Sequence, residues 1–172
     1  MTIAIYQLNK YSAAHFNPAV TIAFTVLKLF PAKEVFPYIF SQIAGAFAGS
    51  ILLKLMFQNN DYLGTTLPSG SVAQSFWLEI ILTLILMLVI LFVSQSKGLI
   101  NKLAGLLIGL TVMFEAYFAG PICGASMNPA RSIAPALVSG HTEHLWLYIS
   151  APIIGAITAV AIWKILKPLK NL

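Results

Sequence analysis

The sequence predicts an all-α membrane protein: a bundle of spanning helices with two half-length helices that enter the membrane without crossing it. Three observations lead to this prediction. Of the 172 residues, 59% are hydrophobic and only 9% are charged, whereas soluble globular domains carry about 25% charged residues. Several apolar stretches are long enough to cross a bilayer. The tripeptide Asn-Pro-Ala occurs twice, and each copy leads into a shorter apolar stretch.

Long apolar stretches predict the spanning helices, because a helix needs roughly 20 apolar residues to cross the hydrocarbon core. We expect these helices at residues 35–57, 73–94, 99–119 and 145–166. The segment from Thr2 to Leu8 is expected to be the end of a further spanning helix. Small residues at four-residue spacing allow helices to approach closely. Such pairs occur at Gly45/Gly49 and at Gly105/Gly109.

The two Asn-Pro-Ala triplets, at residues 17–19 and 128–130, each predict the start of a helix. Asn is a favoured N-cap, Pro is favoured at the first helical position, and Ala is the best helix former. The apolar stretches that follow, 17–27 and 128–138, are too short to cross a membrane. We therefore expect two re-entrant half-helices, each directing the positive end of its dipole toward a pore or a binding site.

The triplets belong to an internal repeat, in which Asn128 follows Asn17 by 111 residues. An odd number of spanning helices separates the copies, so the two halves must enter the membrane from opposite sides as an inverted repeat. We expect an architecture of six spans, numbered 1 to 6, with three in each repeat. Residues 1–70 would form a partial first repeat, with the end of span 2, a half-helix, span 3 and a loop. Residues 71–172 would form a complete second repeat, with spans 4 and 5, a half-helix and span 6. The first repeat would then lack its first helix and most of its second, and this chain alone would conduct poorly.

The charges predict the orientation. The net charge is +5, but the basic residues lie at the ends of apolar stretches and form no stripe with aromatic residues, which argues against nucleic acid as a partner. All lysines except Lys54 fall on one side of the predicted helices, namely Lys10, Lys28, Lys33, Lys97, Lys102, Lys164, Lys167 and Lys170. The positive-inside rule places this side and the C-terminus in the cytoplasm. We expect the protein in the inner or plasma membrane of the cell.

Residues 15–21 and 120–132 together resemble the two signature loops of the major intrinsic proteins, the aquaporin family. The resemblance covers the whole chain, and two loops at this spacing are far more specific than a single Asn-Pro-Ala. It implies a right-handed, aquaporin-like bundle with inverted repeats, which assembles as a homotetramer in the lipid bilayer. It also implies water and small neutral solutes as the molecules that pass.

The resemblance implies a pore lined by Asn17, Asn128 and Arg131. If both Asn side chains cap half-helices, their amide N–H groups are left to donate to a water at the midplane. That water must present its oxygen to both donors and cannot relay a proton, and the helix dipoles repel cations. An arginine within an apolar segment nearly always faces a cavity or a partner, and the resemblance implies that Arg131 lines the narrowest constriction. The half-helix residues that support these caps are Pro18, Ala19, Pro129 and Ala130.

Two further constriction positions follow from the family pattern. Ala116 falls where water-selective members often carry His, and Ala125 fills another position of the constriction. Two alanines make a wider and more apolar aperture. In this respect the chain resembles the nodulin-like plant members of the family and their bacterial relatives. These pass small uncharged solutes of the glycerol or metalloid-acid type besides water. Ser132, Ala136 and Tyr148 follow the aquaporin pattern and not that of glycerol facilitators, so the substrate class stays mixed.

Two carboxylates lie within predicted spanning helices, where each must be paired, hydrogen-bonded or protonated. Glu79 matches a family Glu that accepts hydrogen bonds from the backbone of the re-entrant loop; the alternative is a proton relay of a transporter. Glu115 either faces the pore or braces the loop around Gly120, and the brace is favoured. His15 is expected to fix the first loop by hydrogen bonding.

The sequence thus favours a passive channel for water and small uncharged solutes that excludes protons and ions. A secondary transporter is an alternative, because transporters also use inverted repeats and broken helices, but no set of residues suggests a Na⁺ site. A non-conducting remnant is another. No Ser/His/Asp set, phosphate-binding loop or metal cluster points to an enzyme or a cofactor, and the single Cys123 excludes an intrachain disulfide.

Overall fold

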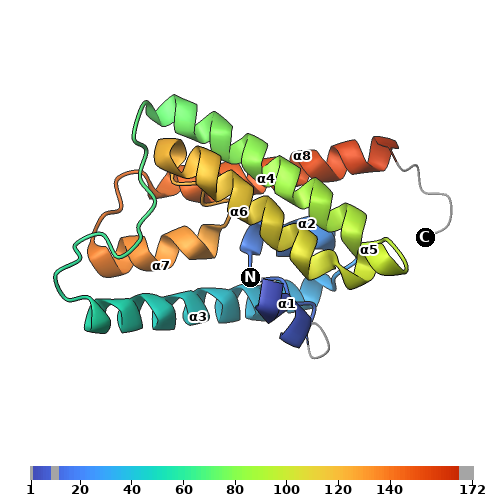
Figure 1. The fold of residues 1–172 in the computed structure, drawn as a ribbon, viewed down its shortest axis with the longest axis horizontal. Coiled ribbons are helices and arrows are strands. Elements are labelled where there is room, and N and C mark those ends of the chain that lie inside the picture. Colours follow the sequence, from blue (N-terminus) through green and yellow to red (C-terminus); the bar gives the residue numbers. More distant parts are fainter. Residues whose placement is uncertain (1, 9–11, 167–172) are drawn as a thin grey trace.

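The computed structural model describes residues 2–8 and 12–166, and every regular element in these ranges is helical (Figure 1). Lys10, Lys167 and Lys170, which the orientation argument used, lie outside the described residues. In chain order the elements are α1 (Thr2–Leu8), α2 (Pro18–Val26), the 3₁₀ turn η1 (Ala32–Glu34), α3 (Val35–Met56), α4 (Val72–Ser94), α5 (Leu99–Lys102), α6 (Ala104–Cys123), α7 (Pro129–Ser139) and α8 (Leu145–Leu166).

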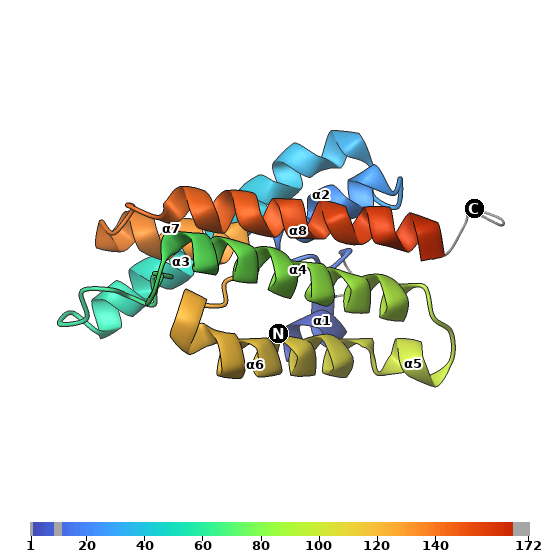
Figure 2. The same ribbon diagram turned by 90° about the horizontal axis from the view of Figure 1, so that it is seen from above.

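Four helices are long and apolar enough to cross a membrane, namely α3 with the preceding turn, α4, α6 and α8. The spans predicted at 35–57, 73–94 and 145–166 are therefore confirmed to within a residue. Helix α4 lies between α6 and α8 and packs most extensively on α8 (Figure 2). The contact with α8 is close at Gly155, where a Cβ atom would collide with the backbone carbonyl of Ile80.

The span predicted at 99–119 is wrong at both ends. The chain first forms the short helix α5, breaks at Leu103, and then forms α6. At this break the carbonyl of Lys102 accepts a hydrogen bond from the Tyr6 hydroxyl at 2.7 Å. At its far end α6 continues through Pro121 to Cys123, although a proline inside a helix removes one helical hydrogen bond and crowds the carbonyl four residues earlier. The helix ends at Gly124, whose φ of 85° is left-handed.

The predicted half-helices are α2, with 9 residues, and α7, with 11 residues. At 1.5 Å per residue each is about 14–17 Å long, roughly half the thickness of a hydrocarbon core. Helix α2 is followed by Lys28 at a φ of 59°, and α7 ends at Gly140 with a φ of 89°. Both half-helices therefore end in a left-handed turn that sends the chain back out.

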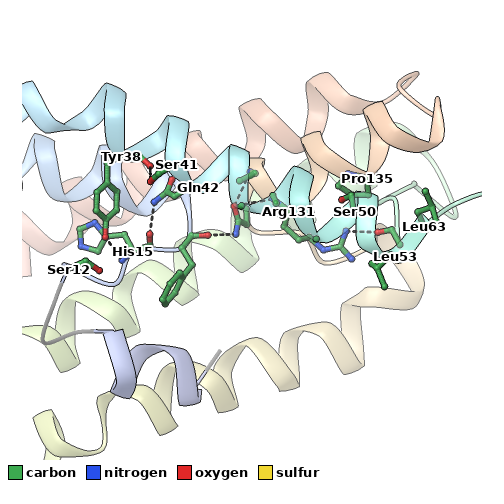
Figure 3. Close-up of a pocket in the computed structure, with 17 residues that line it drawn as sticks. Ser12, His15, Tyr38, Ser41, Gln42, Ser50, Leu53, Leu63, Arg131 and Pro135 are labelled. Carbon is green, nitrogen blue, oxygen red and sulfur yellow. Dashed lines mark hydrogen bonds between the residues drawn. The ribbon is translucent and has the colours of Figure 1, made fainter. Parts of the chain in front are cut away.

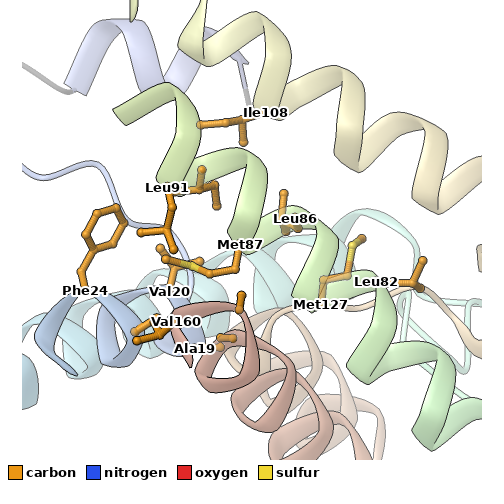
Figure 4. Packing of buried hydrophobic residues seen from close by; sticks show 14 of the residues in the cluster. Ala19, Val20, Phe24, Leu82, Leu86, Met87, Leu91, Ile108, Met127 and Val160 are labelled. Carbon is orange, nitrogen blue, oxygen red and sulfur yellow. The ribbon is translucent and has the colours of Figure 1, made fainter. Parts of the chain in front are cut away.

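The apolar core lies between α2, α4, α6 and α8, and α2 packs most extensively against α8 (Figure 4). Ala19 and Ala23 of α2 are completely buried, and their small side chains let the half-helix approach α8 closely. Val20 of α2 and Met87 of α4 lie next to each other in the same buried cluster (Figure 4). The core therefore fixes the position of the first half-helix.

Helix α3 has a different character. Among its residues only Ser50 is buried, while large apolar side chains such as Phe36 and Phe40 are exposed. The prediction that Gly45 and Gly49 mediate close helix packing is wrong for the described residues, because nothing lies within 4 Å of a Cβ atom built on either. The other predicted pair, Gly105 and Gly109, does receive a neighbouring helix, because side chains of α1 lie directly against it.

Candidate functional site

Asn17 and Asn128 both cap the half-helix that follows them. The side-chain oxygen of Asn17 accepts a hydrogen bond from the backbone N–H of Ala19 at 2.9 Å. The side-chain oxygen of Asn128 accepts from the N–H groups of Ala130 and Arg131, at 3.0 and 3.4 Å. Both Asn residues are extended, with φ near −150°, as an N-cap requires. Pro18 and Pro129 occupy the first helical position, where no N–H is needed.

The two caps are joined by crossed hydrogen bonds. The side-chain nitrogen of Asn17 donates to the carbonyl of Met127 at 2.6 Å, and that of Asn128 donates to the carbonyl of Phe16 at 2.8 Å. In each case the acceptor is the residue just before the opposite Asn, so the arrangement is reciprocal. A primary amide has two N–H donors, and each Asn donates one of them to a carbonyl of the opposite loop. The positive ends of two helix dipoles therefore meet at this point.

Glu79 of α4 holds the second loop. Its two carboxylate oxygens accept hydrogen bonds from the backbone N–H groups of Ser126 and Met127, at 2.7 and 2.8 Å. The side chain is completely buried. Ala125 and Met127 have left-handed φ values of 40° and 54°, and the loop backbone so folded presents both N–H groups to one carboxylate. This is the geometry that the resemblance implied for Glu79.

The first loop is held from α3 through the main chain of His15. The backbone N–H of His15 donates to the Tyr38 hydroxyl at 3.2 Å, and its carbonyl accepts from the Gln42 side chain at 2.6 Å. Gln42 also donates to Thr21 of α2 at 3.0 Å. A polar residue in a spanning helix usually faces the protein interior, so the sequence contained a signal for Gln42 that the prediction missed.

The hydrogen bonds that hold the first loop at His15 come from its main chain and not from the Nδ1 atom of its ring. Its Nδ1 atom is buried and has no hydrogen-bond partner among the described residues. The ring instead stacks on Phe24, with 4.5 Å between ring centroids and 8° between ring planes. Phe24 supplies an apolar face, and burial lowers the pKa of His15 from 6.5 to about 4. The imidazole is therefore neutral near pH 7.

Arg131 lies one turn into α7 and points toward the loop between α3 and α4 (Figure 3). Its Nη1 atom donates to the carbonyl of Gly64 at 2.8 Å. The following residue, Ser132, is completely buried and contacts the hydroxyls of Thr66 and Ser126. The prediction named neither Gly64 nor Thr66, because nothing local in the sequence of this loop indicates that it folds back on α7.

Two hollows border the Asn pair. The larger, about 760 Å³, is lined by Asn128, Arg131 and Gly64 together with one face of α3 (Figure 3). The smaller, about 520 Å³, is lined by Asn17 and by parts of α1, α2, α4 and α6. His15 and Phe16 line both hollows. The larger hollow extends along α3, from Ser12 and His15 at one end to Leu53 and Leu63 at the other (Figure 3). It therefore passes the meeting point of the two half-helices, and the smaller hollow reaches this point at Asn17.

The remaining predicted residues are less closely connected to these hollows. Ala116 is exposed and Ala125 is buried, and neither lines the two hollows. Glu115 is 8% exposed, and neither of its carboxylate oxygens has a hydrogen-bond partner among the described residues. The preferred interpretation of Glu115 as a brace for the loop around Gly120 is therefore not supported. Tyr148 is buried and its hydroxyl donates to the carbonyl of Cys123 at 2.8 Å.

Comparison with known proteins gives consistent results. The sequence profile of the major intrinsic protein family matches residues 1–163. The chain is 42% identical to the putative aquaporin NIP4-1 of Arabidopsis thaliana over 176 residues, covering 99% of this chain and 62% of that protein. It is 40% identical to nodulin-26 of Glycine max over 168 residues, covering 97% of this chain and 62% of that protein. The chain thus spans less than two thirds of the length of these curated relatives.

A solved structure has the same fold. The aquaglyceroporin from Plasmodium falciparum aligns with a TM-score of 0.86 at 27% sequence identity. The alignment covers 98% of this chain and 79% of that chain. The predicted fold class, an all-α membrane protein of the aquaporin type, is confirmed by this likeness together with the four apolar helices.

Proposed function

This chain belongs to the major intrinsic protein family, and from that premise we propose that it forms a passive channel for water and small uncharged solutes that excludes protons and ions. The observation that carries the proposal is the crossed pair of hydrogen bonds between the Asn17 and Asn128 loops. These bonds hold two helix N-termini against each other, and Asn128 lines the larger hollow while Asn17 lines the smaller one.

The Asn pair supplies the means of excluding protons. Each amide uses one N–H on the opposite loop and has a second N–H for a passing molecule. A water between the two donors accepts from both with its oxygen, and it then has no lone pair to continue a proton relay. The positive ends of α2 and α7 repel cations at the same place.

Arg131 is proposed as the selective constriction. Its guanidinium has five N–H donors, and the structure gives one donor atom, Nη1, a bond to the carbonyl of Gly64 at 2.8 Å. Other donors of the guanidinium remain for the oxygen atoms of a solute. A fixed positive charge at a narrow point also raises the energy of a cation there.

The proposed solutes include molecules as large as glycerol or an uncharged metalloid acid. Ala116 and Ala125, proposed as constriction residues, have the smallest side chains other than glycine and would narrow a constriction little. The solved structure with the same fold is an aquaglyceroporin, which supports a solute of this class here. The proposed channel requires no cofactor and no catalytic residue.

Orientation and assembly are proposed from the distribution of charge and of exposed apolar surface. The lysines of the described part, except Lys54, gather toward one side of the predicted helices, which favours a cytoplasmic C-terminus. The exposed apolar face of α3, with Phe36 and Phe40, favours contact with lipid or with a neighbouring subunit. A homotetramer in an inner or plasma membrane would bury part of that face.

The test is a stopped-flow swelling and shrinking assay on proteoliposomes that contain this chain. We expect fluxes of water and glycerol that are small for this chain alone, rise linearly with the gradient and do not depend on an ion gradient. Asn128→Asp should lower the water flux about tenfold, because a carboxylate lacks the amide N–H that contacts Phe16 and places a charge at the constriction. Asn59→Asp, at an exposed loop position, is the matched control.

Two results would oppose the proposal. A saturable flux that requires a Na⁺ gradient would identify a transporter. Equal water permeability of the Asn128→Asp and Asn59→Asp variants would show that the Asn pair does not lie on the path of the solute.

A further inference from the structure

Five hydroxyl groups connect the loop between α3 and α4 to the second half-helix. The hydroxyls of Thr66 and Ser132 form a hydrogen bond with 2.7 Å between their oxygen atoms, and those of Thr65 and Ser139 form one of 2.9 Å. Ser132 and Ser139 are seven residues apart on α7, which is two helical turns, so they lie on one face. The fifth hydroxyl, that of Ser126, forms a hydrogen bond with the hydroxyl of Ser132. Two adjacent threonines thus hold the near and far ends of α7.

Thr66 is the more deeply enclosed of the two threonines. It is 4% exposed, and Ser132 is 0% exposed. A Cβ atom on Gly124 would lie 3.1 Å from the Cβ of Thr66, so the Thr66 side chain already touches the backbone that follows α6. The loop is also tied to α6 by a bond from the N–H of Ser69 to the carbonyl of Ile122 at 3.0 Å. Thr66 is therefore fixed from one side and presents its hydroxyl to α7 on the other.

The same loop segment also holds the guanidinium of Arg131. Gly64, whose carbonyl accepts from Arg131, is two residues before Thr66, and Arg131 directly precedes Ser132. Two hydrogen bonds therefore join residues 64–66 to residues 131–132. In one the Arg131 guanidinium donates to the Gly64 carbonyl, and in the other the hydroxyls of Thr66 and Ser132 are paired. The bond from the Arg131 N–H to the Asn128 cap is long, 3.4 Å, so the cap alone leaves this turn of α7 loosely held.

We infer that Thr66 is a positioning residue for Arg131: its hydroxyl bond to Ser132 sets the rotation of α7 against the loop and keeps the Gly64 carbonyl within reach of the guanidinium. The inference rests on the pore role proposed for Arg131. If the hydroxyl of Thr66 is removed, Ser132 loses one of its two buried hydroxyl partners, and the loop and α7 are free to shift relative to each other.

The chain offers a direct probe, because Arg131 is its only arginine. Labelling with ¹⁵N-arginine therefore gives guanidinium NMR signals from one known position in the protein reconstituted in lipid nanodiscs. In the parent protein the bond to Gly64 slows rotation of the guanidinium, and separate Nη signals are expected. In Thr66→Val, which keeps the shape and removes the hydroxyl, rotation should be about tenfold faster and the Nη signals should merge.

Three further variants separate positioning from general stability. Thr66→Ser keeps a hydroxyl and should restore separate signals. Thr65→Val removes the hydroxyl bond at the far end of α7 and should leave the Arg131 signals unchanged. Ser132→Ala removes the bond to Thr66 from the other partner, together with the bond between Ser132 and Ser126. It decides the question if Thr66→Val does not fold.

The flux assay gives a second readout. Thr66→Val should raise the ratio of glycerol to water permeability about threefold, and Thr66→Ser should restore it. If no variant conducts, the proposed function fails while the NMR comparison still decides the inference. Unchanged Arg131 signals in both Thr66→Val and Ser132→Ala would overturn the inference, as would an equal effect of Thr65→Val.

Discussion

Replacing Glu79 by Gln tests how the second loop is held. The two oxygens of Glu79 accept from the N–H groups of Ser126 and Met127, at 2.7 and 2.8 Å. Gln has the same shape but only one acceptor oxygen, and its NH₂ group would face the other backbone N–H. One buried donor would then have no acceptor, whichever way the amide is turned.

The magnitude follows from this loss. A buried donor left without a partner costs about 1–3 kcal/mol, and a hydrogen bond to a charged acceptor contributes about 1.5–3 kcal/mol. We expect Glu79→Gln to lower the free energy of unfolding by about 2–4 kcal/mol. The carbonyl of Met127 accepts from Asn17 at 2.6 Å, so displacement of Met127 should also weaken the crossed bonds and lower the water flux.

The assay is denaturant unfolding in detergent micelles, followed by circular dichroism, together with the proteoliposome flux. Glu143→Gln is the matched control, because Glu143 is exposed in the loop before α8. A loss below about 0.5 kcal/mol for Glu79→Gln, equal to that of the control, would refute the argument that these two hydrogen bonds hold the loop.

Other predictions follow from single contacts. Gly155→Ala should destabilise the protein by about 1–3 kcal/mol, because the added methyl group meets the carbonyl of Ile80, whereas Gly45→Ala has open space and should have little effect in the same unfolding assay. Because the pKa of His15 is lowered from 6.5 to about 4, the unfolded chain takes up a proton before the folded one does. Stability should therefore fall by about 3 kcal/mol as the pH drops from 6.5 to 4, and His15→Phe should remove this loss in thermal melts. Arg131→Val should admit larger solutes and weaken the rejection of cations, as vesicle flux measurements with a set of solutes would show.

The local features of this fold follow from local features of the sequence. The lengths of apolar stretches predicted α3, α4 and α8 almost to the residue, because the thickness of a bilayer sets the length of an apolar helix. The Asn-Pro pairs predicted the starts of α2 and α7, because an N-cap and a proline at the first helical position act within one turn. The odd number of spans between the triplets predicted that the half-helices approach from opposite sides.

The errors occurred where a distant segment decides the outcome. The break before α6 involves the hydroxyl of Tyr6, which lies 96 residues away from Lys102. The stacking of the His15 ring on Phe24, and the open space at Gly45, depend on which side of each helix receives a neighbour. A sequence pattern shows that a small or polar residue is present, but it does not show which atoms come to face it.

The sequence by itself determined that this is a membrane bundle with two capped half-helices, because length, hydropathy and capping are properties of a few consecutive residues. Only the tertiary structure decided the partners: the carbonyls of Met127 and Phe16 for the two Asn side chains, and that of Gly64 for Arg131. These bonds join residues 67 to 112 positions apart in the chain. Their geometry depends on how whole helices pack, and packing is the sum of many weak contacts that no short motif contains.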